Sequence, residues 1–174
     1  MKDYLIPFVG LKQGLYQYEF EIGNKFFESF EHSPVKSGNV KVDLDLQKQD
    51  VLMILNFSLH GSVNVPCDRC LEDFAQPIEG ENRIIVKFGN ETYEESDEIV
   101  VLSRDEYEID VSQYIYEFIN LAIPLKKVHP DDENGKSSCN PEILKKLEEY
   151  SATEHQKQGT DPRWSALKNL YKKN

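Results

Sequence analysis

Apolar and polar residues alternate through most of the first half of the chain, which is the period of strands with one buried face. The alternation is regular over residues 15–22, 39–47 and 52–65. Residues 48–50 are polar and separate the second stretch from the third, and a connection of this length predicts a hairpin. The pattern therefore predicts antiparallel β-structure in the N-terminal half.

The pattern of the following segments is less regular. Residues 74–88 predict either a pair of strands or one long bent strand, and residues 99–102 predict a short buried strand. Between them, the acidic run 94–98 is typical of an exposed loop. Earlier in the chain, the aromatic residues of 24–30 favour a short helix with Asn24 as its N-cap.

One amphipathic helix is predicted at about residues 110–123. Asp110 is placed as its N-cap, and Pro124 ends it. Apolar side chains recur at spacings of three and four, which makes one wide stripe. The stripe consists of Val111, Tyr114, Ile115, Phe118, Ile119 and Ala122. We expect this stripe to pack against the sheet.

The composition changes after Val128. Residues 129–138 are polar and rich in turn formers, Pro141 opens a charged helix to about Tyr150, and Asp161 with Pro162 begins another helix. The predicted fold class is α+β, with a mainly antiparallel sheet or partial barrel in the N-terminal two-thirds, the packed helix and C-terminal helices. The predicted domains are a β-rich core with its helix at 1–128 and a loop with a helical tail at 129–174.

The net charge of −11 is unevenly distributed. Residues 67–110 hold 14 acids and 4 bases, a net −10, whereas residues 155–174 hold 1 acid and 5 bases, a net +4. An acidic middle repels a phosphate backbone and attracts basic partners, although a merely solvated face has the same composition. Only the tail has the basic character of a surface that binds RNA.

Several features predict a cytoplasmic protein without a membrane segment. No apolar stretch approaches the roughly 20 residues that span a bilayer, and residues 1–4 lack the layout of a signal peptide. The 3 cysteines are an odd number, which does not make a closed disulfide framework.

Cys67-Asp68-Arg69-Cys70 is a C-x-x-C unit with three interpretations. Two thiolates at this spacing can bind one zinc ion, and Cys139 with His129 would complete a tetrahedral site. A thiol redox site would need a following helix and a lowered thiol pKa, whereas Asp68 and other nearby acids favour a raised one. The third interpretation is a structural turn with buried thiols.

No other constellation of catalytic residues is evident. The sequence contains no glycine-rich phosphate loop, no G-x-S-x-G and no H-E-x-x-H, and its 4 histidines are scattered. We therefore expect a protein that is not an enzyme.

Four elements in the same order resemble the bacterial YceD family of large ribosomal RNA subunit accumulation proteins. They are Cys67-Asp68-Arg69-Cys70-Leu71, Ile109-Asp110 with Leu121-Ala122-Ile123-Pro124-Leu125, Val128-His129-Pro130 before Cys139, and Asp161-Pro162-Arg163-Trp164-Ser165-Ala166-Leu167-Lys168-Asn169-Leu170. Many relatives carry a second C-x-x-C near Cys139, so this chain departs from the family pattern there. The resemblance implies a non-enzymatic role in making or stabilising large-subunit ribosomal RNA.

Two partners fit this implied role: large-subunit ribosomal RNA itself, or a basic large-subunit ribosomal protein for which the chain is an acidic chaperone or adaptor. The residues expected to contact either partner are Arg69, Arg163, Trp164, Lys168, Lys172 and Lys173. Arg163 and Trp164 could stack on a base while the lysines approach phosphates. A helix folded back on the core is the alternative for Trp164.

Overall fold

The computed structural model describes residues 2–131 and 135–151. The chain divides into two compact units, Met1–Ser138 and Cys139–Asn174. The elements of the first unit are η1 (Lys2–Tyr4), β1 (Leu5–Pro7), β2 (Gly14–Ile22), α1 (Asn24–Glu28), β3 (Ser37–Lys48), β4 (Leu52–Pro66), β5 (Asp73–Gly89), β6 (Tyr93–Ser96), β7 (Ile99–Ser103), β8 (Glu108–Asp110) and α2 (Ser112–Leu121). The fold class is α+β, as predicted.

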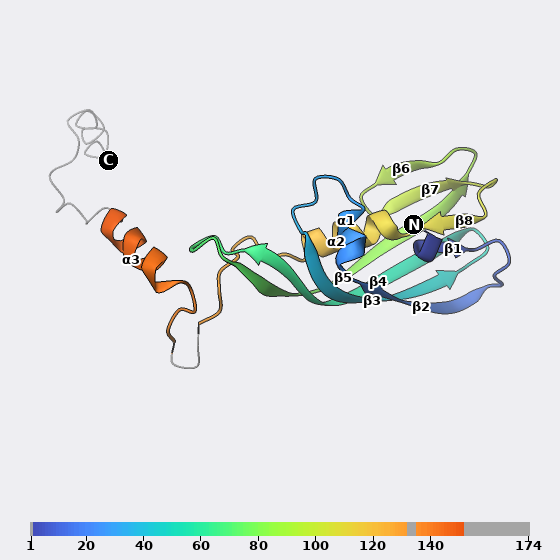
Figure 1. Cartoon of the computed structure of the whole chain (residues 1–174). Coiled ribbons are helices and arrows are strands. Elements are labelled where there is room, and N and C mark those ends of the chain that lie inside the picture. The colour runs from blue at the N-terminus through green and yellow to red at the C-terminus, as the bar shows by residue number, and fades with distance from the viewer. Residues whose placement is uncertain (1, 132–134, 152–174) are drawn as a thin grey trace, which may run out of the picture. The chain divides into compact units, whose positions relative to one another are not determined.

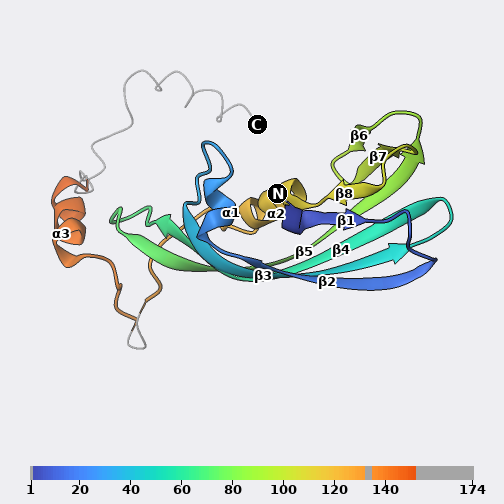
Figure 2. The same cartoon turned by 45° about the vertical axis from the view of Figure 1, so that its right-hand side comes forward.

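The main sheet has six strands in the order β2-β3-β4-β5-β7-β6. All neighbouring strands are antiparallel except β5 and β7, which run parallel from Ile85↔Ile99 onward. A second sheet contains only β1 and β8. The sheet is open, and α1, α2 and the small sheet all lie over the same face of it (Figures 1 and 2).

The core lies between this face and the two helices. Alternate residues of β3 and β4 are buried because successive side chains of a strand point to opposite faces. The ring of Phe57 on β4 meets Phe118 on α2 with centroids 5.1 Å apart, which joins the predicted helical stripe to the sheet. Phe26 and Phe27 of α1 are buried in the same apolar core. The outer face of the sheet carries mostly polar side chains, with Ile54 and Ile85 as a half-buried apolar pair on it.

The structure confirms most of the predicted elements of this unit. The predicted hairpin between β3 and β4 is confirmed, although its turn is residues 49–51 and Lys48 still belongs to β3; residues 74–88 lie within the single long strand β5. The predicted acidic loop is wrong in part, because Tyr93–Ser96 pairs with β7 as an exposed edge strand. The sequence does not predict β6, because its four residues are all exposed and it is a strand only through its pairing with β7.

The predicted N-caps are both displaced by one residue. Gly23 occupies the N-cap of α1, and Asn24 is the first helical residue. Val111 occupies the N-cap of α2, while the Asp110 carboxylate accepts a hydrogen bond from the Ser112 backbone N–H at 2.8 Å. Asp110 therefore accepts a hydrogen bond from one of the free N–H groups at the start of the helix, which is the capping role that was predicted for it.

The second unit contains the predicted charged helix as α3 (Pro141–Tyr150). Its N-cap is Asn140, whose side chain accepts a hydrogen bond from Glu142 N–H at 2.9 Å, and Pro141 follows at the first position. The predicted helix from Asp161 lies outside the described residues. Across the described part of the chain, every helix is too short or too polar to cross a membrane.

Candidate metal centre

The C-x-x-C unit occupies the turn at the end of the β4–β5 hairpin. The two strands pair from Leu52↔Lys87 to Pro66↔Asp73, so residues 67–72 close a long hairpin. Inside the turn, Leu71 N–H donates to the Cys67 carbonyl at 2.9 Å and Cys67 N–H donates to the Glu72 carbonyl at 3.0 Å. Leu71 has a φ of 63°, a left-handed conformation that reverses the chain directly after Cys70. This turn brings both thiols to its inner side.

His129 reaches the turn because the segment before it is held there by Asp68. Asp68 N–H donates to the Lys127 carbonyl, and Lys127 N–H donates to the Asp68 carboxylate, both at 2.7 Å. The Lys127 ammonium lies 3.6 Å from the same carboxylate. The imidazole then packs on Phe74 of β5, with ring centroids 4.7 Å apart. Backbone pairing and ring packing together direct His129 toward the thiols.

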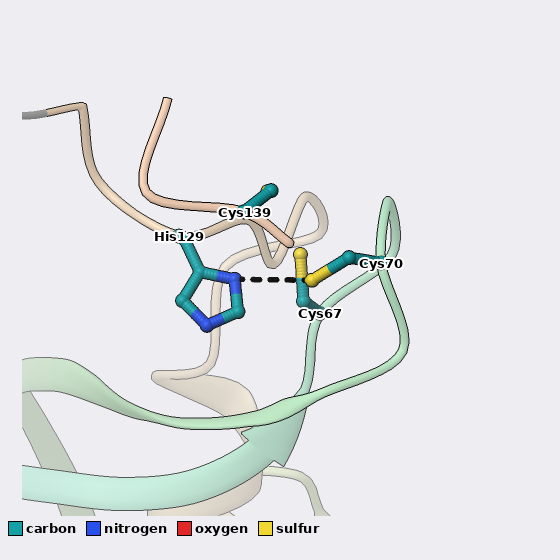
Figure 3. A group of neighbouring side chains, drawn as sticks. All are labelled: Cys67, Cys70, His129 and Cys139. Atoms are coloured by element: carbon teal, nitrogen blue, oxygen red, sulfur yellow. Dashed lines mark hydrogen bonds between the residues drawn. The ribbon is translucent and has the colours of Figure 1, made fainter. Parts of the chain in front are cut away.

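The structure brings all four predicted metal ligands together. The sulfur atoms of Cys67, Cys70 and Cys139 and a ring nitrogen of His129 lie within 4.8 Å of one another. All three cysteines are buried. Cys70 Sγ lies 3.4 Å from His129 Nδ1, and Figure 3 shows the sulfurs of Cys67 and Cys70 on the side of the imidazole. Cys139 is the residue directly after the end of the first unit.

The local electrostatics favour a thiolate at Cys67. Burial by itself would raise the pKa of this thiol, but hydrogen bonds from the backbone N–H groups of Cys70, Arg69 and His129 and from the His129 side chain lower it to about 6. The Arg69 N–H lies 3.4 Å from the sulfur. The expectation that nearby acids raise the pKa is therefore wrong for Cys67, because the donors of the turn surround the sulfur while the side chain of Asp68 points to Lys127.

The donor set fits a tetrahedral structural zinc ion. Zinc binds thiolate sulfur at about 2.3 Å and imidazole nitrogen at about 2.0 Å, which places tetrahedral ligands less than about 4 Å apart. Ligand atoms already within 4.8 Å of one another need only small shifts to reach that geometry. Three thiolates and one imidazole also leave no open position, which is typical of a structural and not a catalytic site.

The other predicted binding residues have different positions. Arg69 donates from Nη1 to the Ser137 hydroxyl at 3.2 Å, so its guanidinium is engaged beside the metal centre. Arg163, Trp164, Lys168, Lys172 and Lys173 lie outside the described residues. The sequence reasoning missed Asp68, Lys127 and Phe74 as the residues that position His129. No local signal marks them, because their roles depend on contacts across 59 positions for Asp68 and Lys127.

Replacing Asp68 by alanine is expected to weaken metal binding without removing a ligand. The change removes the acceptor of the Lys127 N–H and leaves only the backbone hydrogen bond to the Lys127 carbonyl and the packing on Phe74, so His129 is held less firmly. Loss of a group that orients a metal ligand costs about 10–100-fold in affinity. Competition with a zinc chelator measures this loss. Asp73→Ala is the matched control, since Asp73 is an exposed acid at the start of β5 and lies outside the metal group.

Comparison with known proteins identifies the family of the chain. The family model described as "Large ribosomal RNA subunit accumulation protein YceD" matches residues 55–171. The chain is also 29% identical over 140 residues to "Uncharacterized protein YlbN" of Bacillus subtilis (strain 168), which covers 80% of this chain and 76% of that protein. No solved structure matches the chain significantly. The family match covers more than half of the chain and includes all four residues of the candidate metal centre, so the chain belongs to the YceD family.

Proposed function

We propose that this protein is a non-enzymatic factor that supports the accumulation of large-subunit ribosomal RNA. The observation that carries the proposal is the match of residues 55–171 to a family described by that role.

A zinc ion bound by Cys67, Cys70, His129 and Cys139 is the second part of the proposal. The buried thiols, the spacing of the four ligand atoms and the low pKa of Cys67 support it. The ion would fix the hairpin end and the segment around His129 as one rigid surface. A thiol redox role is less well supported, because the C-x-x-C turn is followed by the strand β5 and not by a helix N-terminus.

Contact with RNA is assigned in this proposal to the basic C-terminal segment. Residues 155–174 carry a net +4, and Arg163 and Trp164 combine a cation with an aromatic ring. Such pairs stack on unpaired bases, while Lys168, Lys172 and Lys173 would neutralise phosphates. The rest of the chain is too acidic to attract a phosphate backbone.

The proposal is tested in cells that lack the gene. The amount of large-subunit ribosomal RNA relative to small-subunit RNA should fall, and the full chain should restore it. A chain that ends at residue 160 should restore it poorly, because the basic segment is missing. A full-length chain with Lys168, Lys172 and Lys173 changed to glutamine has the same net charge as the chain that ends at residue 160. Comparing the two separates loss of charge from loss of length.

Two outcomes would contradict the proposal. A normal ratio of the two ribosomal RNAs in the deletion strain would remove the ribosomal role. Full rescue by the chain that ends at residue 160 would remove the RNA contact of the tail while leaving the role of the family intact.

A further inference from the structure

Part of strand β5 is a free sheet edge. β7 pairs with β5 only from Ile85 onward, and Ile85 N–H donates to the Glu98 carbonyl at 2.8 Å. Successive residues of a strand turn their backbone groups to opposite sides. Arg83, Glu81 and Glu79 therefore direct N–H and C=O to the side that β7 does not reach. No strand of the described residues pairs with β5 on this side before Ile85.

Pro77 marks where this free edge ends. It is the next residue that faces the same side, and it has no N–H to donate. Proline is tolerated in a strand where its nitrogen faces away from the neighbouring strand, which is the case here because the register of β4 and β5 continues without interruption past Pro77. The usable edge is therefore short and runs from Glu79 to Arg83.

A groove with an apolar floor adjoins this edge. Two neighbouring hollows of about 640 Å³ and 520 Å³ are both lined by Asp97, Phe118 and Leu121, and together they are the groove. The floor includes Tyr114 and Phe118, and Leu121 at its side is 74% exposed. An exposed leucine beside a free strand edge is a feature that proteins normally cover.

The rim of the groove is negative. Its acids are Glu81, Glu94, Asp97, Glu98 and Glu117. The single cation among the lining residues is Arg83, which already lies 3.9 Å from Glu98. Burial, together with the charges of Glu94, Glu117 and Asp110, raises the pKa of Tyr114 to about 12. A second copy of this acidic chain, or an RNA, would be repelled here, whereas a cationic segment would be attracted.

We propose that this edge of β5 and its groove bind an extended segment of a basic protein, in which Lys or Arg alternates with apolar residues, as an added strand of the sheet. Residues of the new strand opposite Glu79 and Glu81 lie on the outer face, where those carboxylates meet cations. The residues between them turn to the inner face and contact Phe118 and Leu121. Backbone hydrogen bonds to the edge supply affinity that does not depend on sequence.

This inference rests on the proposed function only in naming a partner class for it, and it is tested on the purified protein. The probe is a fluorescent peptide of about nine residues in which lysine and valine alternate. Its anisotropy should rise on titration with the protein and fall with added salt. A peptide of the same composition with all lysines before all valines should bind at least about tenfold more weakly, because only strict alternation matches the two faces.

Backbone methylation of the peptide tests strand addition directly. One version carries N-methyl groups at the lysines and the other at the valines. Only one of the two sets can face β5, so one version should lose at least about tenfold in affinity and the other should bind like the parent. Equal affinities of the two versions would overturn the added strand.

Two matched pairs of variants locate the site. Leu121→Ser should weaken binding roughly tenfold, whereas Leu125→Ser, at an exposed leucine outside the groove, should not change it. Asp97→Lys should weaken binding, whereas Asp105→Lys should not. Equal effects within either pair would overturn the site.

Two further results would also overturn the proposed partner. Tighter binding by the chain that ends at residue 151 would make the protein's own tail the occupant, and displacement of the peptide by a single-stranded RNA would make the partner a nucleic acid. Failure of the ribosomal role in cells would leave peptide binding standing, and absence of peptide binding would leave the ribosomal role standing.

Discussion

Replacing His129 by alanine is expected to lower the zinc affinity of the protein by more than about a hundredfold. The histidine supplies the only nitrogen among the four ligand atoms, and removing a ligand costs more than the 10–100-fold that follows loss of a group that merely orients one. Protein purified without chelators should contain close to one zinc per chain, and the variant should contain almost none. Elemental analysis after dialysis measures both.

The chain offers a matched control at His60. This histidine is exposed in the middle of β4, opposite Lys41 of β3, and it lies outside the metal group. His60→Ala removes the same side chain and should leave the zinc content unchanged. Wild-type protein free of zinc after purification and reconstitution would contradict the metal site, and equal losses in the two variants would mean that the zinc is held nonspecifically.

The effect of losing zinc should be local. The buried apolar core contains Val65 and Ile78 of the hairpin but none of the three cysteines. The sheet therefore keeps its apolar packing without the ion, whereas the turn at residues 67–72 loses the group that ties it to His129. Hydrogen exchange should become faster for residues 66–74 and stay slow in the central part of β3 and β4. A global loss of protection would show instead that metal binding and folding are one event.

The sequence predicts the main fold where a single strand or helix carries its own pattern. The alternation in 39–47 has the period of β3 and lies within its bounds, Ser37–Lys48, and the stripe from Val111 to Ala122 predicts α2. The short strand β6 shows the limit of this reasoning. Its four residues are all exposed, so it has no buried face to detect, and only its pairing with β7 makes it a strand.

The candidate metal centre was likewise predicted in part: its ligands were, and their orientation was not. The four ligands could be named from residue type and spacing, because few residues other than cysteine and histidine bind zinc. Their orientation could not, since it depends on the Asp68 to Lys127 hydrogen bonds and on the ring of Phe74. The pKa of Cys67 was also misjudged from sequence. Charged neighbours are visible in a sequence, but the backbone N–H groups that surround a sulfur appear only in three dimensions.

Replacing Gly61 by alanine is expected to destabilise the protein by roughly 4 kcal/mol, the sum of backbone strain and overpacking. Gly61 has a φ of 154° in the middle of β4, a conformation that residues with a side chain rarely adopt. A Cβ at this position would come within 2.2 Å of the Asn39 carbonyl oxygen and 2.7 Å of the Val40 Cα. Both neighbours are backbone atoms of β3, so they cannot move aside without disturbing the pairing of the two strands.

Gly10→Ala is the control for this change. A Cβ at Gly10 would meet no atom within 4 Å, so the substitution should be neutral or stabilise by less than about 1 kcal/mol through the unfolded chain. Urea denaturation of the two variants measures both free energies. Similar stabilities would mean that β3 and β4 do not approach each other closely at Gly61.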